Sequence, residues 1–285
     1  MPEHLKIRVA KDAGFCFGVR DAIEKAREVA REYGKVYMLG DIVHNERVVN
    51  DLAKENVKVV ESLDEVKDAP VLFRAHGTIP ELWKEAEKKD LTIVDATCPL
   101  VHEIHDEIKK LHMQGRKLII IGDHGHDEVV AIQAQVPEAT VIASIAEAEV
   151  FPRMKKAGVV SQSTQMIENV QEIIGILSMK IYDLRFVNTV CFPTRRNQGQ
   201  IKEIAHISDV MIIVGSFTSA NTKRLHEVSL GLNQRSYMVE DASDIMEDWF
   251  DDAESVGVSA GASSPDELIE EVVEHLNNLH VKSRV

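Results

Sequence analysis

The chain has 285 residues, of which 28% are charged and 44% hydrophobic, which is ordinary for a globular protein of one large or several small domains. Its net charge of −14 argues against a nucleic-acid-binding surface and against a basic surface that faces a membrane. No signal peptide is expected, because the N-terminal segment has no apolar h-region, and no apolar run approaches the length of a membrane span. Three cysteines, an odd number, argue against a disulfide framework, so we expect a reducing, cytoplasmic location.

The predicted elements repeat three times along the chain, and each repeat starts at a cysteine. The cysteine is followed by a helix with an apolar stripe, a short buried strand and a glycine. The cysteine and the glycine are 24 residues apart in all three repeats: 16 to 40, 98 to 122 and 191 to 215. Since the chain has no other cysteine, this common spacing indicates an internal triplication.

Each repeat continues with a polar loop, a helix and a strand, then a further strand that ends in a second polar loop. The predicted strands are 5–9, 36–39, 57–60, 71–73, 91–94, 118–121, 140–143, 158–160, 184–187, 210–214, 237–239 and 255–259. The third repeat lacks its last strand. Residues 5–9 precede Cys16 in the same way that residues 91–94 precede Cys98. We expect the strand at 91–94 to be covered on both faces. We therefore expect residues 1–16 to complete the third module by pairing near 256–259 or 210–214.

Strands that alternate with helices predict an α/β fold with parallel sheets. We divide the chain into a first module of residues 17–97, a second of 98–190 and a third of 191–285, completed by 1–16. Ligands of parallel sheets bind beyond the carboxyl ends of the strands. Three modules around a pseudo-threefold axis would therefore bring their cysteine turns and polar loops to one central cavity.

The polar loops carry hydrogen-bonding side chains at repeat-equivalent positions. The candidates are His44, His76, His126, Glu128, Ser163, Thr164, Ser219, Asn221 and Ser263. Each alone could be a turn or surface residue, and Asn221 could cap the helix that follows it. Their recurrence in six loops favours a shared ligand site.

The three cysteines each stand at the start of a predicted helix, where the helix dipole favours the thiolate. A lone cysteine is more often a small buried hydrophobe, but three at equivalent positions favour a metal centre. Three thiolates suit either zinc or an iron–sulfur cluster with one open iron. Their separations of 82 and 93 residues match no local zinc-finger or ferredoxin motif, and residue chemistry alone leaves both centres open.

Eight short motifs resemble those of the 4-hydroxy-3-methylbut-2-enyl diphosphate reductases, in order and over essentially the whole chain. They are Gly14-Phe-Cys-Phe-Gly-Val19, Val43-His-Asn45, Arg74-Ala-His-Gly77, Asp95-Ala-Thr-Cys-Pro99, Gly125-His-Asp-Glu128, Ser161-Gln-Ser-Thr-Gln165, Ser219-Ala-Asn221 and Ala260-Gly-Ala-Ser-Ser-Pro265. The resemblance implies a trefoil of three α/β domains around a [4Fe–4S] cluster held by Cys16, Cys98 and Cys191. It implies the last step of the non-mevalonate isoprenoid pathway, in which an allylic alcohol diphosphate loses its hydroxyl. It also implies an external one-electron donor such as ferredoxin or flavodoxin.

The resemblance further implies roles for the loop residues. Glu128 would be the general acid, and Ser163, next to Thr164, would position the substrate hydroxyl or its water. The diphosphate would be bound by His44, His76, His126, Ser219, Asn221 and Ser263. The chain departs from the family pattern at Asp127, where the family usually has proline, and at Ser163, where it usually has threonine; the segment from Cys191 to Gln198 is also unusual.

Two other functions fit the same residues. One is a three-cysteine zinc hydrolase of a phosphorylated compound, with Glu128 as its base. The other is a non-catalytic iron–sulfur sensor that binds a diphosphate. Metal content would distinguish the first from the reductase, and turnover with an artificial one-electron reductant would distinguish the second.

Overall fold

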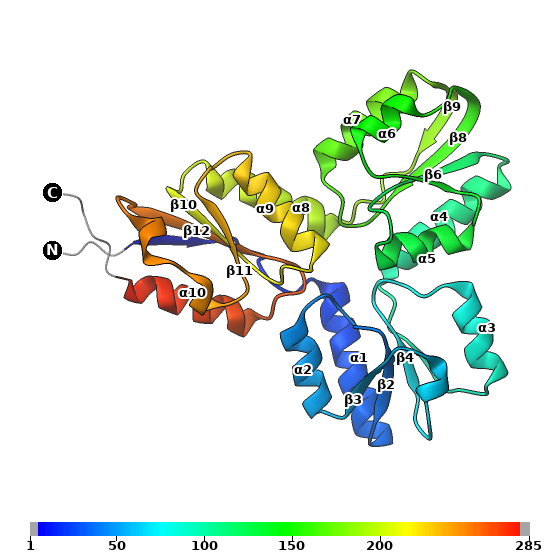
Figure 1. Ribbon diagram of the computed structural model, residues 1–285, viewed down its shortest axis with the longest axis horizontal. Helices are drawn as coiled ribbons and strands as arrows, with labels where there is room; N and C mark the ends of the chain where they lie inside the picture. Colours follow the sequence, from blue (N-terminus) through cyan, green and yellow to red (C-terminus); the bar gives the residue numbers. More distant parts are fainter. Residues whose placement is uncertain (1–4, 280–285) are drawn as a thin grey trace. The chain divides into compact units, whose positions relative to one another are not determined.

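The computed structural model describes residues 5–279, which form three four-stranded sheets with helices packed against them (Figure 1). The strands are β1 (Lys6–Val9), β2 (Val36–Leu39), β3 (Val57–Val60), β4 (Val71–Phe73), β5 (Ile93–Asp95), β6 (Lys117–Ile121), β7 (Thr140–Ile142), β8 (Met154–Ser161), β9 (Ile181–Phe186), β10 (Val210–Val214), β11 (Ser236–Val239) and β12 (Ser255–Ala260). The α-helices are α1 (Phe17–Tyr33), α2 (Glu46–Lys54), α3 (Pro80–Lys88), α4 (Pro99–Met113), α5 (Asp127–Gln135), α6 (Ile145–Val150), α7 (Ile167–Ser178), α8 (Phe192–Ala205), α9 (Ala220–Leu230) and α10 (Asp266–Asn278). Short 3₁₀ turns lie at Leu63–Glu65, Ala242–Asp244 and Glu247–Phe250.

The three sheets share one strand order, and all neighbouring strands run parallel. The orders are β3-β2-β4-β5, β7-β6-β8-β9 and β11-β10-β12-β1. The first strand after each cysteine is thus an inner strand in every sheet, as expected for a triplicated chain. The predicted α/β class with parallel sheets is confirmed.

The N-terminal strand β1 takes the place that β5 and β9 take in the other two sheets. It pairs with β12 from Lys6 opposite Ser255 to Val9 opposite Val258. The predicted completion of the third sheet by the N-terminal segment is therefore confirmed, and its neighbour is β12 rather than β10.

The described chain forms two compact units. One contains the described residues 5–16, 44–48 and 192–279 and holds the sheet of β10; the other contains 17–43 and 49–191 and holds the sheets of β2 and β6. The module borders at 97/98 and 190/191 stay a prediction, as does the convergence of all three modules on one cavity.

The cores follow from the alternation of side chains along buried strands. In the third sheet, every second residue of β10 and β12 belongs to one apolar cluster with four residues of α10: Leu268, Ile269, Val272 and Leu276. Figure 1 shows α8 and α9 over the opposite face of this sheet. In the sheet of β6, one face packs against α7 and the other against α4 and α5. Covered faces explain why β6 and β10 are nearly continuous apolar runs.

Two local expectations were wrong, and one short helix was missed. β5 was expected to be buried on both faces, yet its three residues are only half-buried, because it is an edge strand with one neighbour. β9 begins at Ile181 rather than near Leu184, since its backbone pairs with the start of β8. The short helix α6 was not predicted, although Ser144 caps it by accepting a hydrogen bond from the backbone N–H of Glu147.

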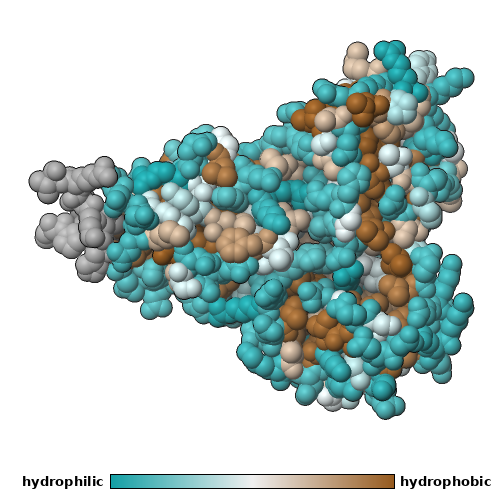
Figure 2. Space-filling model, viewed as in Figure 1, coloured by the Kyte–Doolittle hydropathy of each residue, from teal (hydrophilic) through white to brown (hydrophobic). Residues whose placement is uncertain are grey.

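The face of the molecule shown in Figure 2 consists mainly of hydrophilic residues, with some apolar patches between them. Within residues 5–279, no helix combines the length and the apolar character that crossing a bilayer requires.

Candidate active site

Each cysteine directly precedes a helix. Its backbone is hydrogen-bonded to a polar loop of the sheet that precedes it in the chain. The backbone N–H groups of Cys16, Cys98 and Cys191 donate to the carbonyl oxygens of Ala262, Ala75 and Ser163, with N–O distances of 3.2, 3.0 and 2.9 Å. These three acceptors immediately precede the candidate residues Ser263, His76 and Thr164. One main-chain hydrogen bond per repeat therefore fixes a cysteine beside a candidate binding residue.

The turns before two of the cysteines contain the same kind of hydrogen bond from the backbone to a side chain. Asp95 and Asn188 each lie three residues before a cysteine and accept a hydrogen bond from the backbone N–H two residues on, at 2.9 and 3.2 Å. Asp95 also contacts the imidazole of His102 at 2.8 Å, and its carbonyl accepts from Lys25. These contacts fix the backbone of the turn that places Cys98 at the start of α4.

The cysteines share their exposure and their place at helix starts. All three are partly exposed and remain thiols rather than halves of disulfides. Cys98 is the N-cap of α4, but its side chain does not cap the helix, and Pro99 occupies the first turn as predicted. A thiol at this position faces the positive end of the helix dipole, which favours the thiolate that iron or zinc requires.

Gly18, two residues after Cys16, lies directly against the Cys98 side chain. A Cβ atom at Gly18 would come within 2.6 Å of the Cys98 Sγ. A larger residue at position 18 would therefore force the Cys98 side chain or α1 to move. This close approach leaves the Cys98 thiol in a position that fits a metal ligand.

Glu128 and Ser163 form a buried hydrogen-bonded pair. Glu128 is 2% exposed and lies in the first turn of α5, where its carboxylate accepts from the backbone N–H of Ser163 at 2.6 Å and from the Ser163 Oγ at 2.7 Å. His126 is the N-cap of that helix and accepts from the backbone N–H of Glu128 through its Nδ1. The predicted acid and the predicted positioning hydroxyl are therefore in direct contact.

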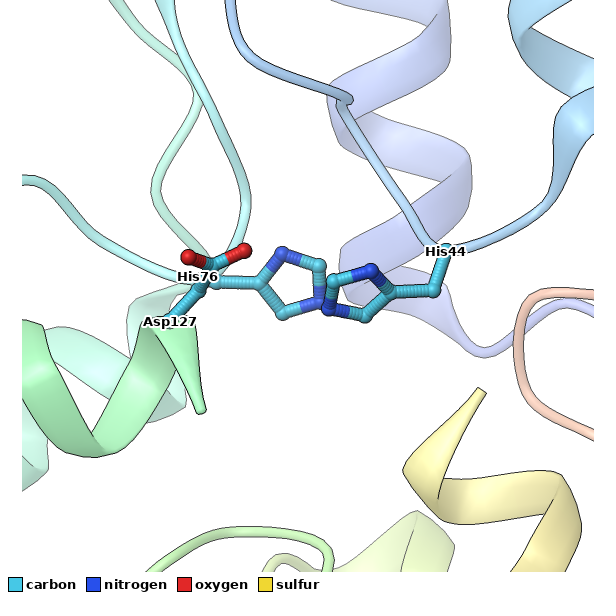
Figure 3. A group of neighbouring side chains, drawn as sticks. All are labelled: His44, His76 and Asp127. Atoms are coloured by element: carbon cyan, nitrogen blue, oxygen red, sulfur yellow. The ribbon is translucent and has the colours of Figure 1, made fainter. Parts of the chain in front are cut away.

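Asp127 has a different environment from its neighbour. Its carboxylate forms an ion pair with the Arg74 guanidinium, Nη2 to Oδ1 2.8 Å, and it is partly exposed. Figure 3 shows its side chain beside that of His76, which follows β4. The rings of His76 and His126 also meet edge to face, with centroids 5.9 Å apart. The two adjacent carboxylates thus have separate partners: Ser163 for Glu128 and Arg74 for Asp127.

The candidates of the third repeat are buried and lie together. Ser219 caps α9 by accepting from the backbone N–H of Thr222, and the Ser263 Oγ lies 3.5 Å from the Ser219 Oγ. Asn221 is 7% exposed, and its Nδ2 has no hydrogen-bond partner among residues 5–279. A buried amide N–H group without an acceptor is unfavourable, so this site fits a ligand that supplies an anionic oxygen.

His44 and Thr164 complete the candidate set. His44 is partly buried and lies in the same compact unit as Ser219 and Ser263. The Thr164 Oγ1 accepts from the Nε2 of Gln162, whose Oε1 accepts from the backbone N–H of Asp123. Sequence reasoning missed the structural contributions of Gly18, Asn45 and Arg74, although all three lie within the quoted motifs.

The sequence model of the LytB protein family matches residues 7–277. The chain belongs to the LytB protein family. Among its relatives, the 4-hydroxy-3-methylbut-2-enyl diphosphate reductase of Geobacter metallireducens is 39% identical over 276 residues, or 96% of this chain and 98% of that protein. The reductase of the same name from Geobacter sulfurreducens is 38% identical, over 98% of this chain and 100% of that protein.

Solved structures agree with this assignment to the LytB family. The E-1-hydroxy-2-methyl-but-2-enyl-4-diphosphate reductase from Plasmodium falciparum superimposes with a TM-score of 0.92 at 26% identity, covering 98% of this chain and 92% of that one. A second structure, described as (E)-4-hydroxy-3-methyl-but-2-enyl diphosphate reductase, the terminal enzyme of the non-mevalonate pathway, gives a TM-score of 0.69 at 35% identity. It covers 95% of this chain and 99% of that one.

These similarities confirm the family predicted from the motifs and make the chain an enzyme of the oxidoreductase class. Membership of the LytB family implies an iron–sulfur cluster. The relatives are named as reductases, which favours the reductase over the zinc hydrolase and over the non-catalytic sensor.

Proposed function

We propose that this chain catalyses the reductive dehydroxylation of 4-hydroxy-3-methylbut-2-enyl diphosphate to isopentenyl and dimethylallyl diphosphates. The reaction consumes two electrons and two protons, breaks the allylic C–O bond and releases the hydroxyl as water. The observation that carries this proposal is the buried Glu128–Ser163 pair, a carboxyl group and a hydroxyl in direct contact, in a chain of the LytB family.

Cys16, Cys98 and Cys191 would hold a [4Fe–4S] cluster in this proposal. Support comes from three thiols at equivalent helix starts and from the glycine that lies against Cys98. When bound, such a cluster supplies single-electron transfer and a Lewis-acidic iron without a protein ligand. The residues of this chain have the remaining tasks of binding the substrate, orienting its hydroxyl and moving protons.

Glu128 supplies the protons. In the hydrogen-bonding arrangement described, the Ser163 Oγ donates to Glu128 Oε2, while the Ser163 backbone N–H fixes Oε1. When Glu128 is protonated, the direction of the Oγ–Oε2 bond reverses, and the serine hydroxyl is then available to donate to the substrate oxygen. Ser163 thus orients the substrate hydroxyl and connects it to the acid.

The diphosphate is bound by hydrogen-bond donors from the polar loops. The proposed set is His44, His76, His126, Thr164, Ser219, Asn221 and Ser263. The buried Asn221 amide supports the inclusion of the third repeat, because an anionic oxygen would satisfy its Nδ2. Imidazoles provide positive charge or neutral donors locally in a chain whose net charge is −14.

The electrons come from an external one-electron carrier, such as a ferredoxin or a flavodoxin. The protein works in the cytoplasm, where a reducing environment keeps its three cysteines as thiols.

The test is anaerobic purification followed by an iron and sulfide count, a visible spectrum and turnover with a chemical one-electron donor. We expect a brown protein that converts the allylic diphosphate to both products. A colourless zinc protein, or a brown protein that binds the diphosphate without converting it, would contradict the proposal.

A further inference from the structure

Asn45 uses both ends of its side-chain amide. Its Oδ1 accepts from the backbone N–H of Val48 at 3.3 Å, which caps α2, and its Nδ2 donates to the backbone carbonyl of Ser263 at 2.9 Å. The side chain is 5% exposed, so both hydrogen bonds are shielded from water. Asn45 directly follows His44, and the two partners Asn45 and Ser263 are 218 residues apart in the chain.

A second contact of the same segment lies at the surface. The Arg47 guanidinium makes a two-pronged ion pair with the Glu271 carboxylate, with distances of 2.9 and 2.7 Å. Both side chains are well exposed, so this pair contributes little free energy. Residues 44–48 accordingly pack with the third sheet, in the compact unit that contains Ser263.

We propose that Asn45 is a positioning residue for diphosphate binding, which holds the loop of Ser263 beside that of His44 through the Asn45–Ser263 hydrogen bond. This inference rests on the proposed function of His44 and Ser263 as diphosphate ligands. Asn45 acts on their backbones and need not contact the ligand. Without the bond, each loop keeps its residues but loses its fixed distance to the other.

The amide of asparagine suits this task because it carries a donor and an acceptor on one short, rigid plane. Aspartate would keep the cap of α2 but would place a second acceptor against the Ser263 carbonyl. Serine would also keep the cap, since both residues are good N-caps, but would lack the Nδ2 donor. These two substitutions therefore separate the contact with Ser263 from the capping of α2.

The experiment compares wild type, Asn45→Asp, Asn45→Ser and the surface control Arg47→Gln as cluster-loaded proteins. It measures the binding of inorganic pyrophosphate by calorimetry, KM and kcat for the allylic diphosphate, the visible spectrum and Tm. We expect pyrophosphate affinity to fall about tenfold in Asn45→Ser and about ten- to hundredfold in Asn45→Asp, as for a lost or opposed buried hydrogen bond. KM should rise in parallel, with kcat, the spectrum and the Arg47→Gln control nearly unchanged.

Three results would overturn the inference. If both variants lower Tm without weakening pyrophosphate binding, Asn45 is only a structural cap. If Asn45→Asp alone weakens binding, the effect comes from its negative charge. If neither changes affinity, the bond has no role in recognition. Should the wild type bind pyrophosphate but fail to turn over the allylic diphosphate, the reaction proposal fails while the role of Asn45 is still decided by the binding data.

Discussion

Arg74 and Asp127 form an ion pair, Nη2 to Oδ1 2.8 Å, between the loop after β4 and the first turn of α5. The guanidinium also lies over Gly40, where an added Cβ would come within 2.8 Å of Nη1. Asp127 stands where the family usually has proline, so a contact of this kind is not part of the usual pattern. Because its charge is paired with Arg74, Asp127 is separate from the Glu128–Ser163 pair.

This separation predicts opposite outcomes for the two neighbouring carboxylates. Glu128→Gln keeps the shape of the side chain but removes the transferable proton, so we expect kcat to fall by about 10²–10⁴ while the cluster and substrate binding persist. Asp127→Pro should stay active within several-fold, since proline is well accepted in the first turn of a helix. Steady-state reduction with a chemical electron donor checks both variants. An active Glu128→Gln beside an inactive Asp127→Pro would show that the acid has been assigned wrongly.

Gly18→Ala should displace the Cys98 thiol, because the added methyl group would lie 2.6 Å from its Sγ. We expect the purified variant to lose most of its iron and sulfide, which a metal and sulfide count measures directly. Gly175→Ala is the matched control: this glycine is also helical, but an added Cβ meets no atom within 4 Å among the described residues. It should keep its cluster and gain up to about 1 kcal/mol of stability from helix propensity. A full cluster in Gly18→Ala would remove the steric argument.

Serine in place of Cys16, Cys98 or Cys191 should remove most of the iron and nearly all activity. The reason is that, in the proposed cluster, each cysteine supplies one of three equivalent ligands, so none can be replaced by the other two. The visible spectrum and the iron content after anaerobic reconstitution check this. A variant with a complete cluster and normal turnover would exclude that cysteine from the ligand set.

His44→Ala and His76→Ala should weaken diphosphate binding and leave the cluster spectrum intact. Each lost hydrogen bond to a charged group should cost roughly 1.5–3 kcal/mol of binding free energy. The rise in KM and the loss of pyrophosphate affinity measure this effect. Unchanged affinity in both variants would make these histidines ordinary loop residues.

Acid should destabilise the fold through His105. Burial lowers the pKa of this histidine from 6.5 to about 4; the side chain is 6% exposed, and its Nε2 has no hydrogen-bond partner among residues 5–279. Below pH 6.5 His105 therefore becomes protonated in the unfolded chain but stays neutral in the folded chain. As a result, the free energy of unfolding falls as the pH drops from 6.5 towards 4. The full effect is about 3 kcal/mol. Denaturant titrations across this range should show a shallower pH dependence for His105→Leu; an unchanged slope would show that other groups govern acid stability.

The sequence predicted the strands and the site residues for one reason: apolar runs, glycines and polar loops recur in register. The inner strands β6 and β10 were recognisable because both of their faces are covered, whereas β5 and β9 are edge strands with mixed exposure and were placed less accurately. The helix starts after Cys16, Cys98 and Cys191 followed from the repeat.

Contacts between segments that are distant in the chain could not be predicted from the sequence. The spacing of residues says nothing of which side chain meets Ser263, so the role of Asn45 was not visible, although its motif was. The Arg74–Asp127 pair likewise depends on how two loops from different sheets meet. By contrast, the contact between Glu128 and Ser163 agrees with the roles expected for them, because both follow inner strands of one sheet.

The pairing of β1 with β12 also affects how the protein is made. Lys6 pairs with Ser255, 249 residues further along the chain, so during synthesis β1 has to wait until β12 has been made. At about 5–20 residues per second, this wait is roughly 10–50 s. The sheets of β2 and β6 can form during that time, while the backbone of β1 has no strand to pair with. A nascent chain that stalls before residue 255 would expose β1 and β10 as open edges, which are prone to aggregation. We therefore expect nascent chains of this enzyme to depend on chaperones until β12 has been made.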